Sequence, residues 1–285
     1  MKSTKKQINN FIQRQEGKSK AVRMATVRLL NQLIGLYIRE VKNTYRNPAI
    51  IALSVIQPLL WIVFFGSSFS YAPKSFLEGF FHTDNYIAFL LSGQLSASML
   101  FVGMFSSLSM IQDKKSGYLR RIMVTPTRNY IIFLAKVLGA STRGMLQVPI
   151  VFLSVMLFGV AIPEPFSLTA FIAALFLLSL GLSSIYLLIT MKSSDWQIPT
   201  VISNFINFPL MFSSTALFPK ENFPPWMQII SDMNPVSYSS TFGREIIISG
   251  NSISANWVYF FYLFIFALVM LIIGMFAATK TLKIE

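Results

Sequence analysis

Two side-chain amides, Asn204 and Asn207, lie three residues apart inside a long stretch without charged residues. Amides in an apolar environment need hydrogen-bond partners, so this pair predicts either contacts between helices or a polar cavity. Catalytic groups are scarce elsewhere, because the chain has no Cys, a single His82 and no Gly-x-x-x-x-Gly-Lys-Ser/Thr phosphate loop. The sequence therefore predicts oriented hydrogen bonding, with neither a metal site nor an acid–base pair.

Six stretches lack Asp, Glu, Lys and Arg, and each is long enough to cross a bilayer as a helix. They are Asn47–Pro73, Asn85–Gln112, Gly144–Pro163, Pro165–Met191, Trp196–Pro219 and Ile246–Thr279. We therefore expect an all-α membrane protein with six transmembrane helices. The expected spans lie at about residues 49–70, 86–111, 130–160, 167–190, 196–217 and 257–278.

The positive charge lies on one side of these stretches. Of 24 Lys and Arg residues, 11 precede the first stretch and 7 fall between the second and the third, whereas only Lys74, Lys220 and Arg244 lie in the alternate connections. By the positive-inside tendency we expect a multi-pass plasma-membrane protein with both termini in the cytoplasm. The net charge of +13 could also suit nucleic acid, but 54% hydrophobic and 12% charged residues favour anionic lipid as the partner.

Two segments precede the first span. Residues 1–25 are lysine-rich and polar, which predicts a disordered basic tail, and residues 26–285 are expected to form one transmembrane domain. Apolar residues recur at three- and four-residue spacing from Val27 to Arg46, with Arg39 and Lys42 on the opposite stripe. This amphipathic surface helix either only anchors the chain or also contacts a partner.

The connection between the second and third spans predicts a short cytoplasmic helix. Its apolar face comprises Tyr118, Leu119, Ile122 and Met123, and its charges are Lys114, Lys115, Arg120 and Arg121. Thr125 and Pro126 end it. Such a helix either docks an apolar face into a groove of another protein or lies on lipid. Lys136 and Arg143, at the start of the third span, either extend toward the membrane surface or line a cleft facing the cytoplasm.

The external connection from Phe218 to about Trp257 is too aromatic for a solvated loop. Pro225 predicts the start of one helix, and Asn234-Pro235 predicts a break before a second. Because backbone enters a membrane only when protein covers it or water faces it, we expect a re-entrant helical hairpin.

Together these connections resemble those of the export-type, or type 2, permeases of ATP-binding-cassette transporters. Asp113–Pro126 is similar to the family's acidic–basic–acidic–x–Gly…Leu…Thr/Ser-Pro pattern, and Phe218–Arg244 to its Phe-Pro…Pro-Pro-Trp…Asn-Pro…Arg pattern. Lys115 departs from the first pattern, where the family has an acid. Drug- and antibiotic-resistance permeases are the most similar group, because the loops are compact.

The resemblance implies a permease homodimer with two cytoplasmic ATPase subunits, which would bind the ATP and Mg²⁺. The ATPase contacts implied are Lys114, Lys115, Tyr118, Leu119, Arg120, Arg121, Ile122, Thr125 and Pro126, with Arg39 and Lys42. The implied substrate pathway comprises Gln94, Ser98, Asn204, Phe205, Asn207, Phe208 and Met211. The implied external gate comprises Pro224, Pro225, Trp226, Asn234, Pro235 and Arg244.

The predicted function is export of a hydrophobic or amphipathic substrate, such as a drug, an antibiotic, a lipid or a glycolipid. An ion-coupled secondary transporter is an alternative, but such carriers usually need ionisable groups near the membrane midplane, and here the span centres hold no carboxylate. An intramembrane enzyme is a second alternative, and it lacks catalytic groups.

Overall fold

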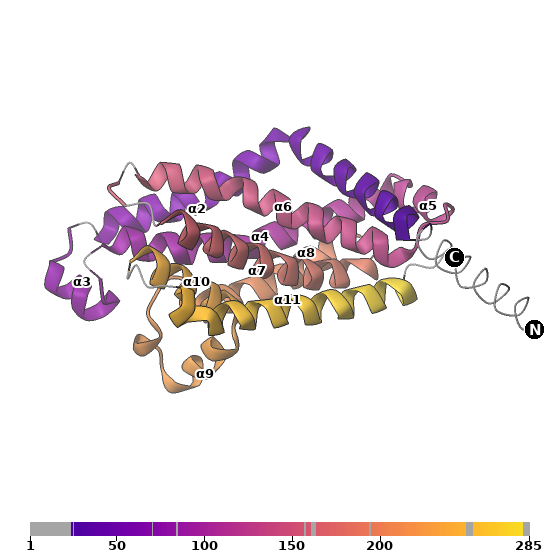
Figure 1. The fold of residues 1–285 in the computed structure, drawn as a ribbon. Coiled ribbons are helices and arrows are strands. Elements are labelled where there is room, and N and C mark those ends of the chain that lie inside the picture. Colours follow the sequence, from indigo (N-terminus) through magenta and orange to yellow (C-terminus); the bar gives the residue numbers. More distant parts are fainter. Residues whose placement is uncertain are drawn as a thin grey trace, which may run out of the picture.

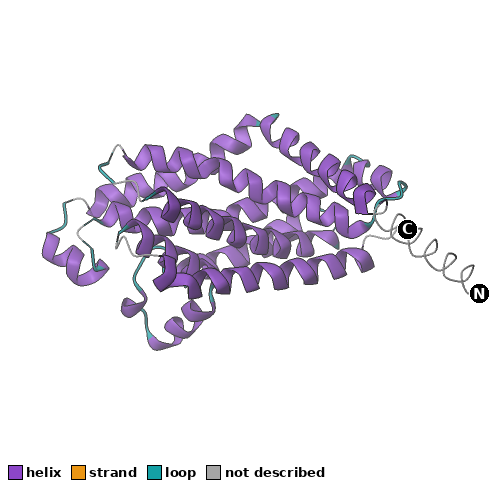
Figure 2. Cartoon of the chain, in the orientation of Figure 1, coloured by secondary structure: helices purple, strands orange, loops and turns teal. Residues whose placement is uncertain are grey.

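The computed structural model describes residue 24 and residues 26–281, except residues 70, 84, 157, 161–163, 194 and 249–252. Within this part the chain is helical and has no strand (Figures 1 and 2). Apart from Met24, the basic tail predicted for residues 1–25 lies outside the described residues. The long helices run side by side in a bundle. The N-terminal helix, residues 26–45, and α5 lie at one end of it, and α3 lies at the other (Figure 1).

The helices follow one another with short connections. After the N-terminal helix they are α2 (Pro48–Phe69), α3 (Lys74–Phe81), α4 (Tyr86–Lys115), α5 (Tyr118–Met123), α6 (Asn129–Met156), α7 (Pro165–Met191), α8 (Gln197–Phe212), the 3₁₀ turn η1 (Lys220–Asn222), α9 (Pro225–Met233), α10 (Pro235–Ile247) and α11 (Ile253–Thr281).

Helix α4 is the centre of the bundle. It packs against α2, α6, α7, α8 and α10. The Asn85 side chain accepts a hydrogen bond from the Ala88 amide and caps its start. A Cβ added at Gly93 would lie 1.9 Å from the Ala216 carbonyl oxygen, so only glycine lets α4 approach the turn after α8 this closely. The Ser96 hydroxyl donates to Ser239 of α10 at 2.9 Å. Small and hydroxyl residues thus allow close helix packing here.

Helices α2 and α11, which lie near the two ends of the chain, leave apolar side chains exposed. On α2, Leu53, Leu60 and Phe64 are exposed, and on α11, Phe261 and Phe276 are exposed. Exposed apolar surface of this extent is expected to face lipid or another membrane helix.

Among the described residues, five helices are long and apolar enough to cross a membrane: α2, α4, α6, α7 and α11. The fifth predicted span, 196–217, coincides with α8, which has only 16 residues. At 1.5 Å per residue, α8 is about 24 Å long, below the roughly 30 Å of a hydrocarbon core. The chain then continues in turns through residue 217. The count of six spans stays a prediction.

Helices α9 and α10 meet at Asn234, where the sequence predicts a break between two helices. The Asn234 side chain accepts from the Val236 amide at 3.0 Å and donates to the Leu210 carbonyl at 2.7 Å. One side chain therefore caps α10 and ties it to α8. Re-entry of this pair into the membrane stays a prediction.

Candidate functional site

A cluster of four charged side chains joins three helices at the α5 end of the bundle. Asp113, in the last turn of α4, accepts two hydrogen bonds from Arg39 of the N-terminal helix, at 2.6 and 3.0 Å. It also accepts one from Lys136 of α6 at 2.6 Å. Glu40 lies 2.8 Å from Arg39 Nη1 and 3.2 Å from Lys136 Nζ. Two carboxylates therefore neutralise two cations, and we call these four residues the ionic cluster.

The ionic cluster also contacts α5, since the Arg39 guanidinium lies 3.4 Å from the centre of the Tyr118 ring. Burial lowers the pKa of Arg39, but the hydrogen bond and charge of Asp113, with Glu40, outweigh burial and raise it overall. Burial raises the pKa of the Tyr118 hydroxyl, and Asp113 and Glu40 raise it further, while Arg39 lowers it. The N-terminal helix, α4, α5 and α6 are thus linked by charge at one place.

Helix α5 turns its apolar face inward. Leu119 is 3% exposed and belongs to a core cluster with Met110, Ile132 and Met191, against which Ile122 also packs. The sequence predicts that this face either docks into a groove of another protein or lies on lipid. In the structure it packs against other helices of the same chain, and docking to a partner stays a prediction. Gly117, at φ 69°, lets the chain reverse direction after α4, which brings the apolar face against the core. The face left outward carries Arg120, Arg121 and Val124, the last being 70% exposed.

The other residues predicted to contact an ATPase lie in different surroundings. Lys114 donates to three carbonyls at the end of α7, those of Thr190, Met191 and Ser193, at 2.6 to 3.2 Å. It therefore serves as a cap. Lys115 lies 3.4 Å from Asp195, and both side chains are about half exposed. Lys42, Thr125 and Pro126 are exposed, and Gln32 donates to the Pro126 carbonyl at 3.3 Å.

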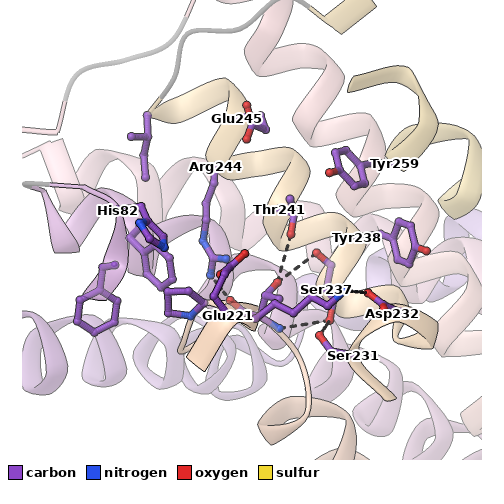
Figure 3. Close-up of a pocket in the computed structure, with 16 residues that line it drawn as sticks. His82, Glu221, Ser231, Asp232, Ser237, Tyr238, Thr241, Arg244, Glu245 and Tyr259 are labelled. Atoms are coloured by element: carbon purple, nitrogen blue, oxygen red, sulfur yellow. Dashed lines mark hydrogen bonds and ion pairs between the residues drawn. The ribbon is translucent and has the colours of Figure 1, made fainter. Parts of the chain in front are cut away.

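A pocket of about 420 Å³ lies near the opposite end of the bundle, between the α3–α4 connection, the turn after α8, and α10 (Figure 3). Arg244 of α10 extends into it and stacks on Phe89 at 3.6 Å. Its guanidinium donates to the carbonyls of Thr215 and Ala216, whereas its Nε has no partner. Burial lowers the pKa of Arg244, with a smaller opposing effect from Glu221 and Tyr86. Arg244 thereby fastens α10 to the turn after α8.

Of the predicted gate residues, only Arg244 lines this pocket. Pro224 and Pro225 begin α9 and are exposed, as is Trp226 at 64%. Asn234 and Pro235 are buried between α9 and α10. Figure 3 shows Ser231, Ser237 and Thr241 on the pocket wall, beside the ion pair between Lys220 and Asp232.

The predicted substrate residues are divided between the interior and the surface. Gln94, Ser98, Asn207 and Met211 are buried, and the Tyr186 hydroxyl donates to Asn207. Phe205 is 79% exposed and Phe208 54%, while Asn204 is partly buried. The structure does not bring the seven into one surface.

Sequence reasoning missed several polar contacts. It did not single out Glu40, and it named Asp113 only as part of a motif. Both belong to the few acids in the strongly basic part of the chain, and that isolation is the signal that could have identified them. Gln147, which donates to Ser98 at 2.8 Å, was also missed, although it is the one amide in the uncharged stretch of the third span. Among the described residues, no group of three His, Asp or Glu could hold a metal ion.

Comparison with known proteins points to one family. Residues 31–248 match the model of a family described as ABC-2 type transporter. The chain is 32% identical over 213 residues to a protein named putative transport permease ycf38 from Cyanophora paradoxa, which covers 74% of this chain and 72% of that protein. It is 26% identical over 152 residues to the probable multidrug ABC transporter permease YbhR of Escherichia coli strain K12, covering 53% and 41%. It is 24% identical over 194 residues to the daunorubicin resistance ABC transporter permease protein DrrB1 of Streptomyces coeruleorubidus, covering 68% and 66%.

Proposed function

The chain belongs to the ABC-2 type transporter family and is the membrane subunit of an ABC transporter, and we propose that it exports a hydrophobic or amphipathic substrate. Candidate substrates are a drug, an antibiotic, a lipid or a glycolipid, taken from the cytoplasm or the inner leaflet. The family works with an ABC ATPase subunit. Because this chain lacks the Gly-x-x-x-x-Gly-Lys-Ser/Thr loop, we assign ATP and Mg²⁺ binding to that partner.

We further propose that two copies of this chain assemble with two ATPase subunits in the plasma membrane. Support comes from the exposed apolar faces, above all that of α8, where Phe205 and Phe208 extend away from the bundle. A second copy would cover these rings. Alternating access or a transient lateral opening between the two copies would then move the substrate.

The ionic cluster is the observation that carries this proposal. A force applied to α5 would reach Arg39 through Tyr118, and from Arg39 it would reach α4 through Asp113. Lys136 extends the connection to α6. Charge-assisted hydrogen bonds with little exposure resist separation, so the four helices would move together. A partner that pushes on α5 would thereby tilt long helices as rigid bodies.

The outward face of α5 supplies the test. Arg120 and Arg121 are exposed, and replacing both by Glu would oppose an acidic partner surface. In vesicles that contain the chain and its ATPase, we expect Arg120→Glu/Arg121→Glu to lower substrate-stimulated ATP hydrolysis about tenfold. A tenfold change corresponds to a loss of about 1.4 kcal/mol in the free energy of docking. The amount of protein in the membrane should not change.

Lys74→Glu is the matched control, since Lys74 is exposed at the other end of the bundle and should leave stimulation intact. Substitution of Leu119 by Asp is unsuitable, because this side chain is buried and its loss would disturb the core. Full stimulation in the α5 variant would refute docking through this face.

The positions of the carboxylates do not support the alternative function, an ion-coupled carrier. Asp113 lies in the last turn of α4 and is paired with two cations. Among the described residues, the centres of the long helices hold no carboxylate that could exchange a proton or bind a cation.

A further inference from the structure

A second, smaller cavity lies between α2, α4 and α6, within the long helices. Its volume is about 170 Å³. The wall is formed by apolar side chains with four hydroxyl or amide groups among them, and no ionisable side chain takes part. The lining residues are Leu53, Ser54, Gln57, Ser98, Phe101, Val102, Phe105 and Gln147. We call this cavity the amide pocket.

The orientation of the Gln147 amide follows from its neighbours. The Ser98 hydroxyl donates to the Leu95 carbonyl at 2.7 Å, so its oxygen is left to accept a hydrogen bond. Gln147 Nε2 donates to that oxygen at 2.8 Å. The other end of the amide, Gln147 Oε1, is buried and has no partner. The pocket therefore contains a free acceptor whose identity is set by the hydrogen-bond network.

Gln57 contributes the opposite kind of group. Its Nε2 is buried and also has no hydrogen-bond partner. Gln57 lies one residue before Pro58, and a proline cannot donate to the carbonyl of Ser54, four residues earlier. That carbonyl, on another lining residue, lacks its ordinary helical partner. A free donor and a free acceptor thus line one apolar pocket.

Leaving such groups buried and unpaired costs about 1–3 kcal/mol each. A hydroxyl or a neutral amide both donates and accepts, so one such group on a ligand could satisfy Gln147 Oε1 and Gln57 Nε2. A charged group would find no counter-ion among the lining residues. An apolar molecule would leave both amides unpaired. The chemistry of the wall therefore selects an uncharged polar group.

The volume limits what enters. A cavity of about 150 Å³ accepts one benzene ring, so the amide pocket holds one ring or a short chain and not a whole drug-sized molecule. Exposed side chains of α2, such as Leu53 and Leu60, continue the apolar surface outside it. The remainder of a ligand would lie along that surface.

We propose that the amide pocket binds the uncharged, hydroxyl- or amide-bearing end of an amphiphile, with its apolar tail along α2. This ligand would be a substrate class for the proposed export function, and its role as a substrate rests on that function. The binding itself requires neither the ATPase subunit nor ATP, so it can be measured separately.

The test compares two molecules that differ at one group. The full chain in phosphatidylcholine vesicles, without ATPase, is labelled with a photoreactive alkylphenol, and unlabelled para-pentylphenol or para-pentylanisole competes. Only the phenol can donate a hydrogen bond. We expect the phenol to compete about three- to tenfold better than the anisole, the range that one neutral hydrogen bond supplies. Equal competition by the two molecules would overturn the proposal.

Three variants test whether the amide pocket is the place where these molecules bind. Gln147→Leu should remove most of the advantage of the phenol, because Gln147 Oε1 would accept its hydrogen, whereas Gln57→Leu should weaken the phenol and the anisole alike, because Gln57 Nε2 can donate to either oxygen. Gln112→Leu should change neither, because Gln112 is an exposed amide near the end of α4. If Gln147→Leu loses its fold along with its bond to Ser98, Gln57→Leu decides alone, since its Nε2 has no bond to lose. Unchanged binding of both molecules in Gln57→Leu would refute the site.

Two sources could supply the polar group. Monoolein added to the vesicles is a lipid with free hydroxyls, and its displacement of the label, dependent on Gln57, would identify a bilayer lipid as occupant. Displacement by para-pentylphenol alone would identify a soluble amphiphile. Either result supports the amide pocket. Normal phenol binding without any stimulated ATPase activity would instead contradict the proposed export function and leave the pocket in place.

Discussion

The Asp113 carboxylate accepts hydrogen bonds from cations on two different helices, and it is the residue on which the ionic cluster depends. Removing one member of a nearly buried ion pair leaves the other charges uncompensated, which costs about 3–5 kcal/mol. We expect Asp113→Asn to lower thermal stability, measured by fluorescence in detergent, by an amount in this range. Lys136, whose side chain is 4% exposed, would lose its best partner.

Asp195→Asn is the matched control for this substitution. Its partner, Lys115, is 3.4 Å away, and both side chains are about half exposed, so their pair contributes at most about 1 kcal/mol. We expect almost no change in the unfolding temperature. Equal losses in the two variants would mean that Asp113 does not stabilise the fold through its buried pairs.

Residue types alone could identify only part of these sites. Amides and small residues within uncharged stretches predict helix contacts, and buried Asn207 and Ser98 do make such contacts. The sequence cannot predict which cation meets Asp113, since Arg39 and Lys136 are distant in the chain and only packing brings them together. The same limit applies to the amide pocket, whose four polar residues come from three helices.

At the scale of elements, the contact between α4 and the turn after α8 depends on Gly93. A methyl group there would overlap the Ala216 backbone, which cannot yield as a flexible side chain would. We expect Gly93→Ala to destabilise the protein by about 1–3 kcal/mol through overpacking. Thermal unfolding measures the loss.

Gly35→Ala makes the same chemical change where nothing lies within 4 Å of the added carbon. Gly35 is inside the N-terminal helix, so alanine should stabilise it by about 0.5–1 kcal/mol through reduced backbone freedom. A stabilised Gly93→Ala variant would show that α4 can move away from the turn without cost.

Most helix boundaries follow from local signals in the sequence. Proline starts α7, α9 and α10, and Gly117 marks the reversal between α4 and α5. Two features escaped prediction. The length of α8 depends on the turn at residues 213–218, which Arg244 holds from a distant helix, and the inward face of α5 depends on the core that it covers. The spacing of apolar residues within one helix predicts neither the length of α8 nor the core that α5 covers.

At the scale of the whole molecule, the one-sided charge predicts the orientation in the membrane. The chain has no Cys, so single cysteines report cleanly. Ser75 and Ser116 are exposed near opposite ends of the bundle. In intact cells an impermeant maleimide should label Ser75→Cys and reach Ser116→Cys only after permeabilisation. Ser237, although on the predicted external side, is buried and unsuitable. The reverse pattern of labelling would invert the topology.

The proposed homodimer can be tested on the face of α8. Phe205 is 79% exposed, and rings that meet across a two-fold axis would bring equivalent positions together. We expect Phe205→Cys to form a disulfide-linked dimer under mild oxidation in membranes. Phe261→Cys on α11, 51% exposed, should remain monomeric because lipid would cover it. Cross-linking at Phe261 alone would assign the interface to α11.

The central position of α4 has a consequence for how the protein is made. Its Ser96 hydroxyl pairs with Ser239, which lies 143 residues later in the chain. At about 5–20 residues per second, ribosomes synthesise that segment only roughly 7–30 s after the Ser96 segment of α4. Throughout that interval newly inserted α4 lacks its neighbour α10, whereas α6 and α7 are synthesised during it. Biogenesis therefore includes a stage in which Ser96 of α4 cannot yet pair with Ser239, and this stage ends only when α10 is synthesised.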